Sequence, residues 1–324
     1  MPQDSLRIIP LGGIGQIGKN MMVFEYDDQL LIVDCGLMFP ESDMLGIDIV
    51  IPDMEYVFER KEQVRAIVVT HGHEDHVGGL PYLMKQVKAP LYTTRLTRGL
   101  IEVKLKEHHL LDGAELHTVD PQDILDLDPF KVEFFRVCHS IPDGVGLGIT
   151  TPVGLVVHSG DFKFDQTPVD GKLTDFAKLA ELGGRGVHVL FSDSTNSETT
   201  GQTPSEQVVG ETFDRIFARA EGRIIVATFA SNISRVQQVA DTAHKSGRRV
   251  GLVGRSMVNY AKQAAKLGYL DLDPDELPPY FRMDLDISKR IAEKLDLSVN
   301  IRNLLNRKNY ISSIYGAENG VPEP

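Results

Sequence analysis

The stretch THGHEDH, residues 70–76, gathers four side chains of types that bind metal ions: His71, His73, Asp75 and His76. The chain has only 10 histidines, and three within six residues would be awkward in a core. Histidines at i and i+2 can face one cation, while Asp75 and His76 can turn toward a second. The motif therefore predicts a metal centre, with room for two neighbouring ions.

Two adjacent ions need further ligands, and two later residues are candidates. His139 ends the apolar run EFFRVCH, and Asp161 ends the run GLVVHSGD. A carboxylate can bridge two cations, so Asp161 suits a shared position. Asp34, at the end of LLIVDCG, is predicted to orient one ligand through a hydrogen bond. The remaining histidines are interpreted as solvated or hydrogen-bonded: His108, His109, His117, His158, His188 and His244.

The elements that must position these residues follow from apolar patterning. Residues 64–70 form an apolar run typical of a buried strand, and residues 78–87 have apolar side chains at helical spacing. The histidine motif therefore lies at a strand-to-helix corner, where a rigid scaffold can present reactive groups. Residues 6–33 are predicted as antiparallel strands with a turn at Asp27 and Asp28.

Gly13, Gly15 and Gly18 match the G-x-G-x-x-G dinucleotide-binding pattern. That pattern works only when a helix follows to receive the pyrophosphate. Here the β-rich sequence MMVFEYDDQLLIVD follows instead. A tight glycine loop is therefore favoured over a nucleotide site.

A second domain is predicted to begin near residue 205. Thr203 as N-cap, Pro204 at the first helical position and Glu206 completing a capping box predict a helix through residue 220. Alternating strand and helix patterns after it predict βαβ units around a parallel sheet. Farther on, Ile287, Ile291 and Leu295 are placed on one helical face. The predicted divisions are 1–204, 205–279, and a helical tail with a disordered end at 280–324.

Composition limits the possible functions. The 324 residues suit about two domains, and the net charge of −12 argues against coating nucleic acid by bulk attraction. Cys35 and Cys138 are too few for a disulfide framework and are expected to be buried thiols in a reducing compartment. No apolar run approaches the ~20 residues of a membrane span, and no signal segment is recognised. A cytoplasmic protein without a membrane partner is expected.

Several motifs together resemble a known family. They are PLGGIGQIGKN, DCGLMFPE, DIVIPD, THGHEDHVGGLPYL, HSIPD, HSGDFKFD, DSTNSE, TFASNISRVQQ and GRSM, spread over residues 6–276. The set resembles the metallo-β-lactamase fold, within it the β-CASP nucleases, and most closely the ribonuclease J family. The resemblance implies an α/β fold: an αββα sandwich with a two-zinc site at its edge and a partial β-CASP α/β domain.

The resemblance also assigns roles. His71, His73 and His139 would hold one zinc, Asp75 and His76 the other, with Asp161 bridging; catalytic roles fall to Asp75, Asp161 and Asp193. Arg255 and Ser256 resemble residues that grip an RNA phosphate, although Arg255 equally suits an ordinary helix start. The implied reaction is hydrolysis of RNA, endonucleolytically or 5′ to 3′ from a 5′-monophosphate end, in RNA processing and decay, including that of rRNA. Manganese in place of zinc and a homodimer are also compatible with the resemblance.

The chain departs from the family pattern in one respect. In that family the chain returns to complete the sandwich and brings two further histidine motifs, whereas this chain has no histidine after His244. A truncated chain, a weaker second metal site and impaired activity are therefore expected. Two alternatives stay open: an RNA-binding or assembly subunit that retains the metal site, and a hydrolase of small esters or thioesters.

Overall fold

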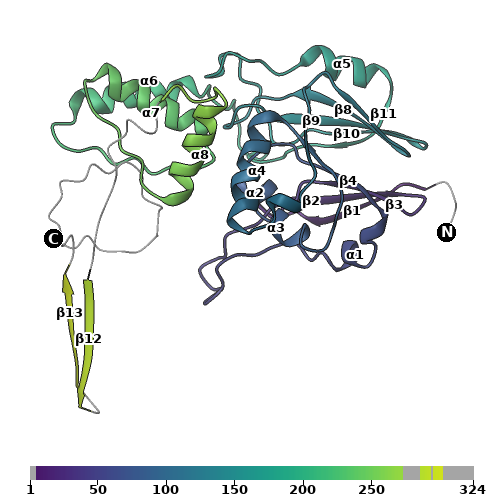
Figure 1. Ribbon diagram of the computed structural model, residues 1–324. Coiled ribbons are helices and arrows are strands. Elements are labelled where there is room, and N and C mark those ends of the chain that lie inside the picture. Colours follow the sequence, from purple (N-terminus) through teal and green to yellow (C-terminus); the bar gives the residue numbers. More distant parts are fainter. Residues whose placement is uncertain (1–4, 273–284, 293–294, 302–324) are drawn as a thin grey trace.

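The computed structural model describes residues 5–272, 285–292 and 295–301, and Figure 1 shows a layered body with a group of helices beside it. In its first sheet the first three strands pair antiparallel and the next three add in parallel. Asp27 and Asp28 form the predicted turn, with φ values of 46° and 58°. In spatial order the strands are β1 (Arg7–Gly12), β2 (Met21–Tyr26), β3 (Gln29–Val33), β4 (Val64–Val68), β5 (Leu91–Thr93) and β6 (Leu116–Thr118).

The second sheet is mostly antiparallel, and only the strand that comes last along the chain pairs in parallel with its neighbour. In spatial order its strands are β11 (Val187–Phe191), β10 (Gly154–His158), β9 (Val145–Thr151), β8 (Phe130–Arg136) and β7 (Ile124–Leu127). Successive side chains of a strand point to opposite faces, so each strand can serve two apolar layers. Phe134 packs between the two sheets while Phe135, the next residue, packs on the outer side of the second sheet.

The helices cover the outer faces of both sheets, which confirms the predicted αββα order. Met22 and Phe24 of β2 face the second sheet, whereas Met21 and Val23 face the helices of the first layer. Cys35 and Cys138 are buried free thiols, as expected. The covering helices are α1 (Glu55–Phe58), α2 (Glu74–Val77), α3 (Leu80–Leu83) and α4 (Arg95–Glu107) on the first sheet, and α5 (Phe176–Gly184) on the second, with single 3₁₀ turns at Lys61–Gln63 and Leu111–Gly113.

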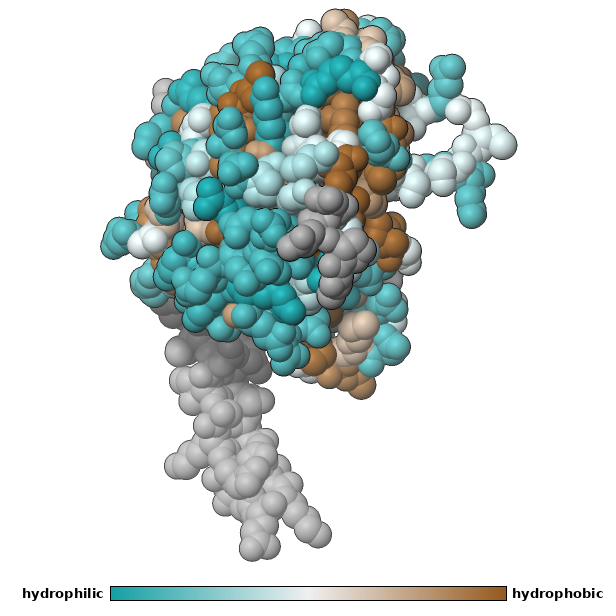
Figure 2. Space-filling model, turned by 90° about the vertical axis from the view of Figure 1, so that its right-hand side faces the viewer, coloured by the Kyte–Doolittle hydropathy of each residue, from teal (hydrophilic) through white to brown (hydrophobic). Residues whose placement is uncertain are grey.

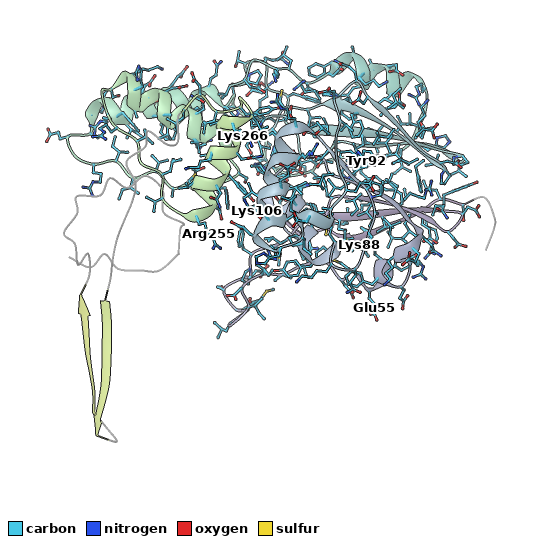
Figure 3. All side chains as sticks on the ribbon, viewed as in Figure 1. Glu55, Lys88, Tyr92, Lys106, Arg255 and Lys266 are labelled. Atoms are coloured by element: carbon cyan, nitrogen blue, oxygen red, sulfur yellow. The ribbon has the colours of Figure 1, made fainter. Side chains whose placement is uncertain are left out.

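Three helices form the group beside the sandwich: α6 (Gln207–Arg219), α7 (Ile233–Lys245) and α8 (Arg255–Lys266). Helix α8 runs beside α4 (Figures 1 and 3), and Figure 3 shows Arg255 and Lys266 at its two ends. Leu96 and Leu100 of α4 pack against Met257 and Ala261 of α8. The helical group is therefore joined to the sandwich through an apolar contact.

The parallel sheet predicted for this group is not formed by the described residues. Residues 221–230 and 248–251 hold no strand; Val226 and Val250, one from each segment, lie in the wall of a cavity of about 480 Å³. Instead of a backbone ladder, the Arg248 guanidinium donates to the carbonyl oxygens of Gly222, at 2.8 Å, and of Ala220. An apolar run becomes a strand only where a neighbouring backbone pairs with it. Here the Arg248 side chain, rather than a backbone N–H, donates to these carbonyl oxygens.

The predicted capping box of α6 is also wrong. The helix begins at Gln207 rather than directly after Thr203, and the Gln207 N–H donates to the Ser205 hydroxyl at 3.2 Å. The Asp165 carboxylate accepts hydrogen bonds from the Glu206 backbone N–H at 3.0 Å and from the Ser205 hydroxyl at 3.1 Å. Ser205 therefore supplies the capping hydroxyl predicted for Thr203, and a carboxylate distant in sequence holds Ser205 and Glu206 in place.

The helix predicted in the tail is wrong where the structure describes that segment. Leu285–Ala292 (β12) and Leu295–Ile301 (β13) pair as an antiparallel hairpin. Leu295, Leu297, Val299 and Ile301 alternate with polar residues, and this period of two is typical of a strand. The helical interpretation matched every fourth residue and missed this alternation. The predicted disordered end at 316–324 lies outside the described residues.

In the view of Figure 2 hydrophilic residues cover most of the surface, and hydrophobic residues gather in separate strips. Most large apolar side chains of the sandwich are instead buried between its layers. Within the described part of the chain, each helix is too short or too polar to cross a bilayer.

Candidate metal centre

The histidine motif occupies the corner after β4, as its sequence predicts. The strand ends at Val68, and His71 follows in the interior with 1% of its surface exposed. A Cβ on Gly72 would lie 2.8 Å from Leu100 Cδ1, so a larger residue between the two histidines would require the Leu100 side chain of α4 to shift. His73 is the N-cap residue of the one-turn helix α2, which turns Asp75 and His76 back toward the strand end.

Three imidazoles from two segments converge at this corner. His73 Nδ1 lies 3.2 Å from His71 Nε2 and 3.1 Å from His139 Nε2. One ligand atom from each of these residues can be chosen so that all lie within 4.8 Å of one another. The structure therefore brings together the three histidines predicted to hold the first ion.

Asp161 lies between this trio and His76. Its Oδ2 is 3.7 Å from His139 Nε2 and 4.0 Å from His71 Nε2, while its Oδ1 is 3.4 Å from His76 Nε2. The two carboxylate oxygens thus face two groups of nitrogens, which is the arrangement of a shared ligand. Asp75 Oδ2 lies 3.6 Å from His76 Nε2. The second set of converging donors is His71, His76 and Asp161, with Asp75 beside it.

Asp34, predicted to orient one of the ligands, lies against His76. Its Oδ2 lies 2.8 Å from His76 Nδ1, and its Oδ1 accepts from the Thr70 backbone N–H at 2.8 Å. The Thr70 hydroxyl lies 2.9 Å from Asp34 Oδ2. A proton on His76 Nδ1 directed at Asp34 leaves the lone pair of Nε2 facing Asp161. Asp34 therefore sets the tautomer and ring orientation of a candidate ligand.

Replacing Asp34 with asparagine is expected to weaken zinc binding by about 10- to 100-fold while the fold is retained. The amide no longer fixes the His76 tautomer, because it can present either an acceptor or a donor. Competition with a chromophoric chelator measures the affinity. Asp112→Asn, at an exposed position, is the matched control. Equal affinity in wild type and Asp34→Asn would show that His76 is oriented by other contacts.

Burial sets most of the ionisation behaviour. Desolvation, reinforced by neighbouring imidazoles, holds the pKa values of His71 and His73 well below the ordinary histidine value. Desolvation also lowers the pKa of His139, against the pull of the Asp161 carboxylate. These three rings are therefore neutral at physiological pH and offer lone pairs, the form in which histidine binds metals.

The other groups respond differently. Desolvation raises the pKa of Asp75. Burial also opposes ionisation of Asp161, but His76 and the other imidazoles outweigh it and lower the pKa of this carboxyl. For His76 burial disfavours the charged ring, yet the carboxylates of Asp34 and Asp161 outweigh burial and raise its pKa. A proton on His76 thus competes with a cation, and metal affinity is expected to fall as the pH is lowered.

Asn20 is a contact that the sequence analysis missed. Its side-chain nitrogen lies 3.3 Å from Asp75 Oδ2 and 3.0 Å from His76 Nε2, and it also donates to the Asp75 carbonyl oxygen at 3.1 Å. The sequence feature that could have indicated Asn20 is its position between the glycine loop and β2. Ser140 was missed as well; its hydroxyl lies 3.4 Å from His73 Nε2.

A cavity of about 850 Å³ opens beside the cluster and includes Asp75, Asp161 and Asp193 in its wall. The glycine loop at residues 13–18 forms one side and residues 192–199 form the other. Gly13, Gly15 and Gly18 all have positive φ, and antiparallel β2 follows them, as expected for a tight loop rather than a nucleotide site. The Asp193 carboxylate accepts from the Thr195 backbone N–H at 2.8 Å.

Arg255 and Ser256 stand apart from this cavity and do not line it. The Arg255 side chain is 84% exposed, and its Nε lies 3.8 Å from Glu107 Oε1 at the end of α4. This partner favours the ordinary helix-start interpretation of Arg255. The phosphate-binding role of the two residues stays a prediction.

The donor set fits a divalent transition-metal ion. Neutral imidazole nitrogens and carboxylate oxygens are the ligands that zinc prefers, and manganese accepts the same types. Asp34 contacts the His76 ring from behind, at Nδ1, as partners of metal ligands do in known sites, whereas Asn20 lies beside Nε2, the nitrogen that faces Asp161. Without a cation, neutral imidazoles would crowd together for no structural gain.

Comparison with protein families divides the chain in two. The model of the metallo-β-lactamase superfamily matches residues 14–201, and the model described as ribonuclease J, β-CASP domain, matches residues 221–284. The first match contains the candidate metal ligands, and the second contains α7 and α8.

Relatives of known name resemble the chain over most of its length. Ribonuclease J of Synechocystis sp. is 50% identical over 276 residues, which cover 85% of this chain and 43% of that protein. Ribonuclease J of Thermus thermophilus is 48% identical over 276 residues, covering 83% of this chain and 48% of that protein. Ribonuclease J2 of Bacillus subtilis is 45% identical over 275 residues, covering 85% and 49%. The chain thus spans about half the length of these relatives.

A solved structure of a protein of unknown function from Enterococcus faecalis shares the fold. It superimposes with a TM-score of 0.58 at 18% sequence identity, covering 85% of this chain and 72% of the other. The layered fold, the metal-ligand motif and both family matches agree. The chain belongs to the metallo-β-lactamase superfamily, and its residues 221–284 match the β-CASP domain of ribonuclease J.

Proposed function

We propose that this chain is a metal-dependent ribonuclease that hydrolyses phosphodiester bonds of RNA. The observation that carries the proposal is the convergence of His71, His73 and His139 with His76 and Asp161, beside an open cavity whose wall includes Asp75 and Asp161. Relatives named ribonuclease J support RNA as the substrate class. Cleavage 5′ to 3′ from a 5′-monophosphorylated end, endonucleolytic cleavage, a cytoplasmic location, a role in RNA processing and a homodimer are included as finer parts of the proposal.

The ligands divide between two ions. His71, His73 and His139 would hold one zinc, and Asp75, His76 and Asp161 the other, with Asp161 shared and manganese as an alternative metal. A cation at this site supplies a water of lowered pKa and neutralises charge that develops on phosphoryl oxygens. This sharing by Asp161 rests on its two oxygens facing different nitrogens.

The remaining residues position the ligands and the substrate. Asn20 holds the Asp75 carboxylate, and Asp34 holds the His76 ring. Asp193 shares the cavity wall with Asp161, where a carboxylate can take part in proton transfer near the departing oxygen. Hydroxyl groups between Ser192 and Thr199 line the same cavity and can donate to the phosphates of a nucleic-acid backbone.

The test combines metal content with cleavage of a 5′-monophosphorylated RNA by the purified chain. We expect near two metal ions per chain, loss of cleavage on chelation, recovery with added zinc or manganese, and strongly reduced cleavage by Asp75→Ala. Bound metal and bound RNA without cleavage would instead support the RNA-binding alternative. Faster hydrolysis of a thioester than of RNA would contradict the ribonuclease assignment.

A further inference from the structure

Two tyrosines of the helical group contact carboxylates that lie inside the loops of the candidate ligands. The Tyr260 hydroxyl donates to Glu74 Oε1 at 2.9 Å, and the Tyr269 hydroxyl donates to Asp143 Oδ2 at 2.7 Å. Glu74 lies between His73 and Asp75 in the sequence. Asp143 lies in the turn that follows His139. Each tyrosine thus joins the second domain to a different ligand segment.

The first bridge is held from both sides. Tyr260 is 3% exposed and packs among apolar residues of α4 and α8. Glu74 Oε2 lies 2.7 Å from Lys104 Nζ of α4, so the Glu74 carboxylate is clamped between two helices. Because Glu74 is the first residue of the one-turn helix α2, a displacement of α8 acts directly on the backbone that carries Asp75 and His76.

The second bridge holds the turn after His139. Asp143 has φ of 70°, and its Oδ2 also accepts from the Leu96 backbone N–H at 3.2 Å. Its backbone carbonyl accepts from the Thr94 hydroxyl at 2.9 Å. Tyr269 adds a donor from beyond the end of α8. The left-handed conformation of this non-glycine residue is therefore stabilised by contacts from two other segments.

A third contact reaches the Asp161 loop. Lys163 Nζ lies 2.8 Å from Glu206 Oε1, and Arg235 Nη2 of α7 lies 2.8 Å from Glu206 Oε2. The Lys163 backbone N–H donates to the Cys138 carbonyl at 2.8 Å, which ties the Asp161 loop to the segment of His139. Polar contacts from the helical group therefore end beside all three segments that carry candidate ligands.

We propose that Tyr260 and Tyr269 are positioning residues that couple the placement of the α6–α8 group to the metal affinity of the site. The inference rests on the proposed function, because it requires that the cluster binds metal. By thermodynamic linkage, any substrate that holds the helical group against the sandwich tightens metal binding, and metal in turn tightens that contact. The metal centre would then reach full affinity only with both domains in place.

The test measures zinc affinity of the full chain for wild type, Tyr260→Phe, Tyr269→Phe and the double variant. Phenylalanine keeps the packed ring and removes only the hydroxyl. Each single variant is expected to bind zinc about 3- to 10-fold more weakly, the size of one ordinary hydrogen bond, and the double variant more weakly still. The matched control is Tyr56→Phe, which removes a tyrosine hydrogen bond to Glu25 away from the ligand loops.

A second measurement separates coupling from general destabilisation. In wild type, added zinc is expected to slow amide hydrogen exchange in α8, and the double variant should lose this response. Zinc affinities equal to wild type in both single variants, or an equal loss in Tyr56→Phe, would overturn the coupling alone. A wild-type chain that binds no zinc would overturn the proposed function together with the coupling.

Discussion

Asp161→Asn is expected to reduce bound metal from near two ions toward one per chain and to slow RNA cleavage by about 10²–10⁴-fold. The Asp161 oxygens face His139 on one side and His76 on the other, so an uncharged amide weakens both groups of donors. A bound cation contributes several kcal/mol to the stabilisation of developing charge, and each 1.4 kcal/mol is worth tenfold in rate. Elemental analysis and single-turnover cleavage measure the two effects.

Asp126→Asn is the matched control for this variant. Asp126 is an exposed residue of β7 and should leave metal content and cleavage unchanged. If Asp161→Asn kept both ions and the wild-type rate, Asp161 would not be a shared ligand, and the arrangement of its two oxygens would need another explanation.

Gly36→Ala is expected to damage the site through the backbone. After β3, residues 34–37 run against the backbone of α2: the Cys35 N–H donates to the His76 carbonyl at 2.9 Å and the Leu37 N–H to the Glu74 carbonyl at 3.1 Å. A Cβ on Gly36 would lie 1.5 Å from the Asp75 carbonyl oxygen, which no rotamer can relieve. Overpacking of this kind costs about 1–3 kcal/mol or more. Moving a reacting group by about 1 Å costs about 10²-fold in rate, so cleavage should fall at least that far.

Gly183→Ala provides the comparison. Gly183 lies in α5, where a Cβ would meet no atom within 4 Å, and alanine is favoured in helices by about 0.5–1 kcal/mol. Urea unfolding should therefore show lower stability for Gly36→Ala and unchanged or higher stability for Gly183→Ala. Wild-type zinc affinity and cleavage in Gly36→Ala would show that α2 can shift without loss of the ligand geometry.

Strand-end placement made much of the site predictable from sequence. The run after β4, His139 and Asp161 all follow apolar strands, and the structure brings them together. The role of Asp34 was also accessible, because a carboxylate at the end of a neighbouring strand has few other places to direct its oxygens. The antiparallel pairing of β2 and β3 followed from the apolar runs on either side of the turn at Asp27 and Asp28, whereas the sandwich was implied by the family resemblance.

Other features depend on contacts between residues that lie far apart in the sequence, and local sequence patterns do not reveal such contacts. The contact of Asp165 with Glu206, just before α6, and the contact of Asn20 with Asp75 join segments 41 and 55 residues apart. Local pattern could not reveal that residues 221–230 would form no strand among the described residues, because pairing is decided by which backbone lies alongside. In the tail the apolar residues also fit a helical spacing, but the alternation of apolar and polar residues was the stronger signal, and the segment forms a hairpin.

By itself the sequence determined the donor types, their order and their placement at strand ends, because these are local properties of a chain that alternates in and out of a layer. Only the tertiary structure decided which donors face one another and which residues hold them. Tyr260 is separated from Glu74 by 186 residues, and their hydrogen bond exists only because α8 packs beside α4. Contacts of that kind depend on how whole elements pack, and no local pattern in the sequence records them.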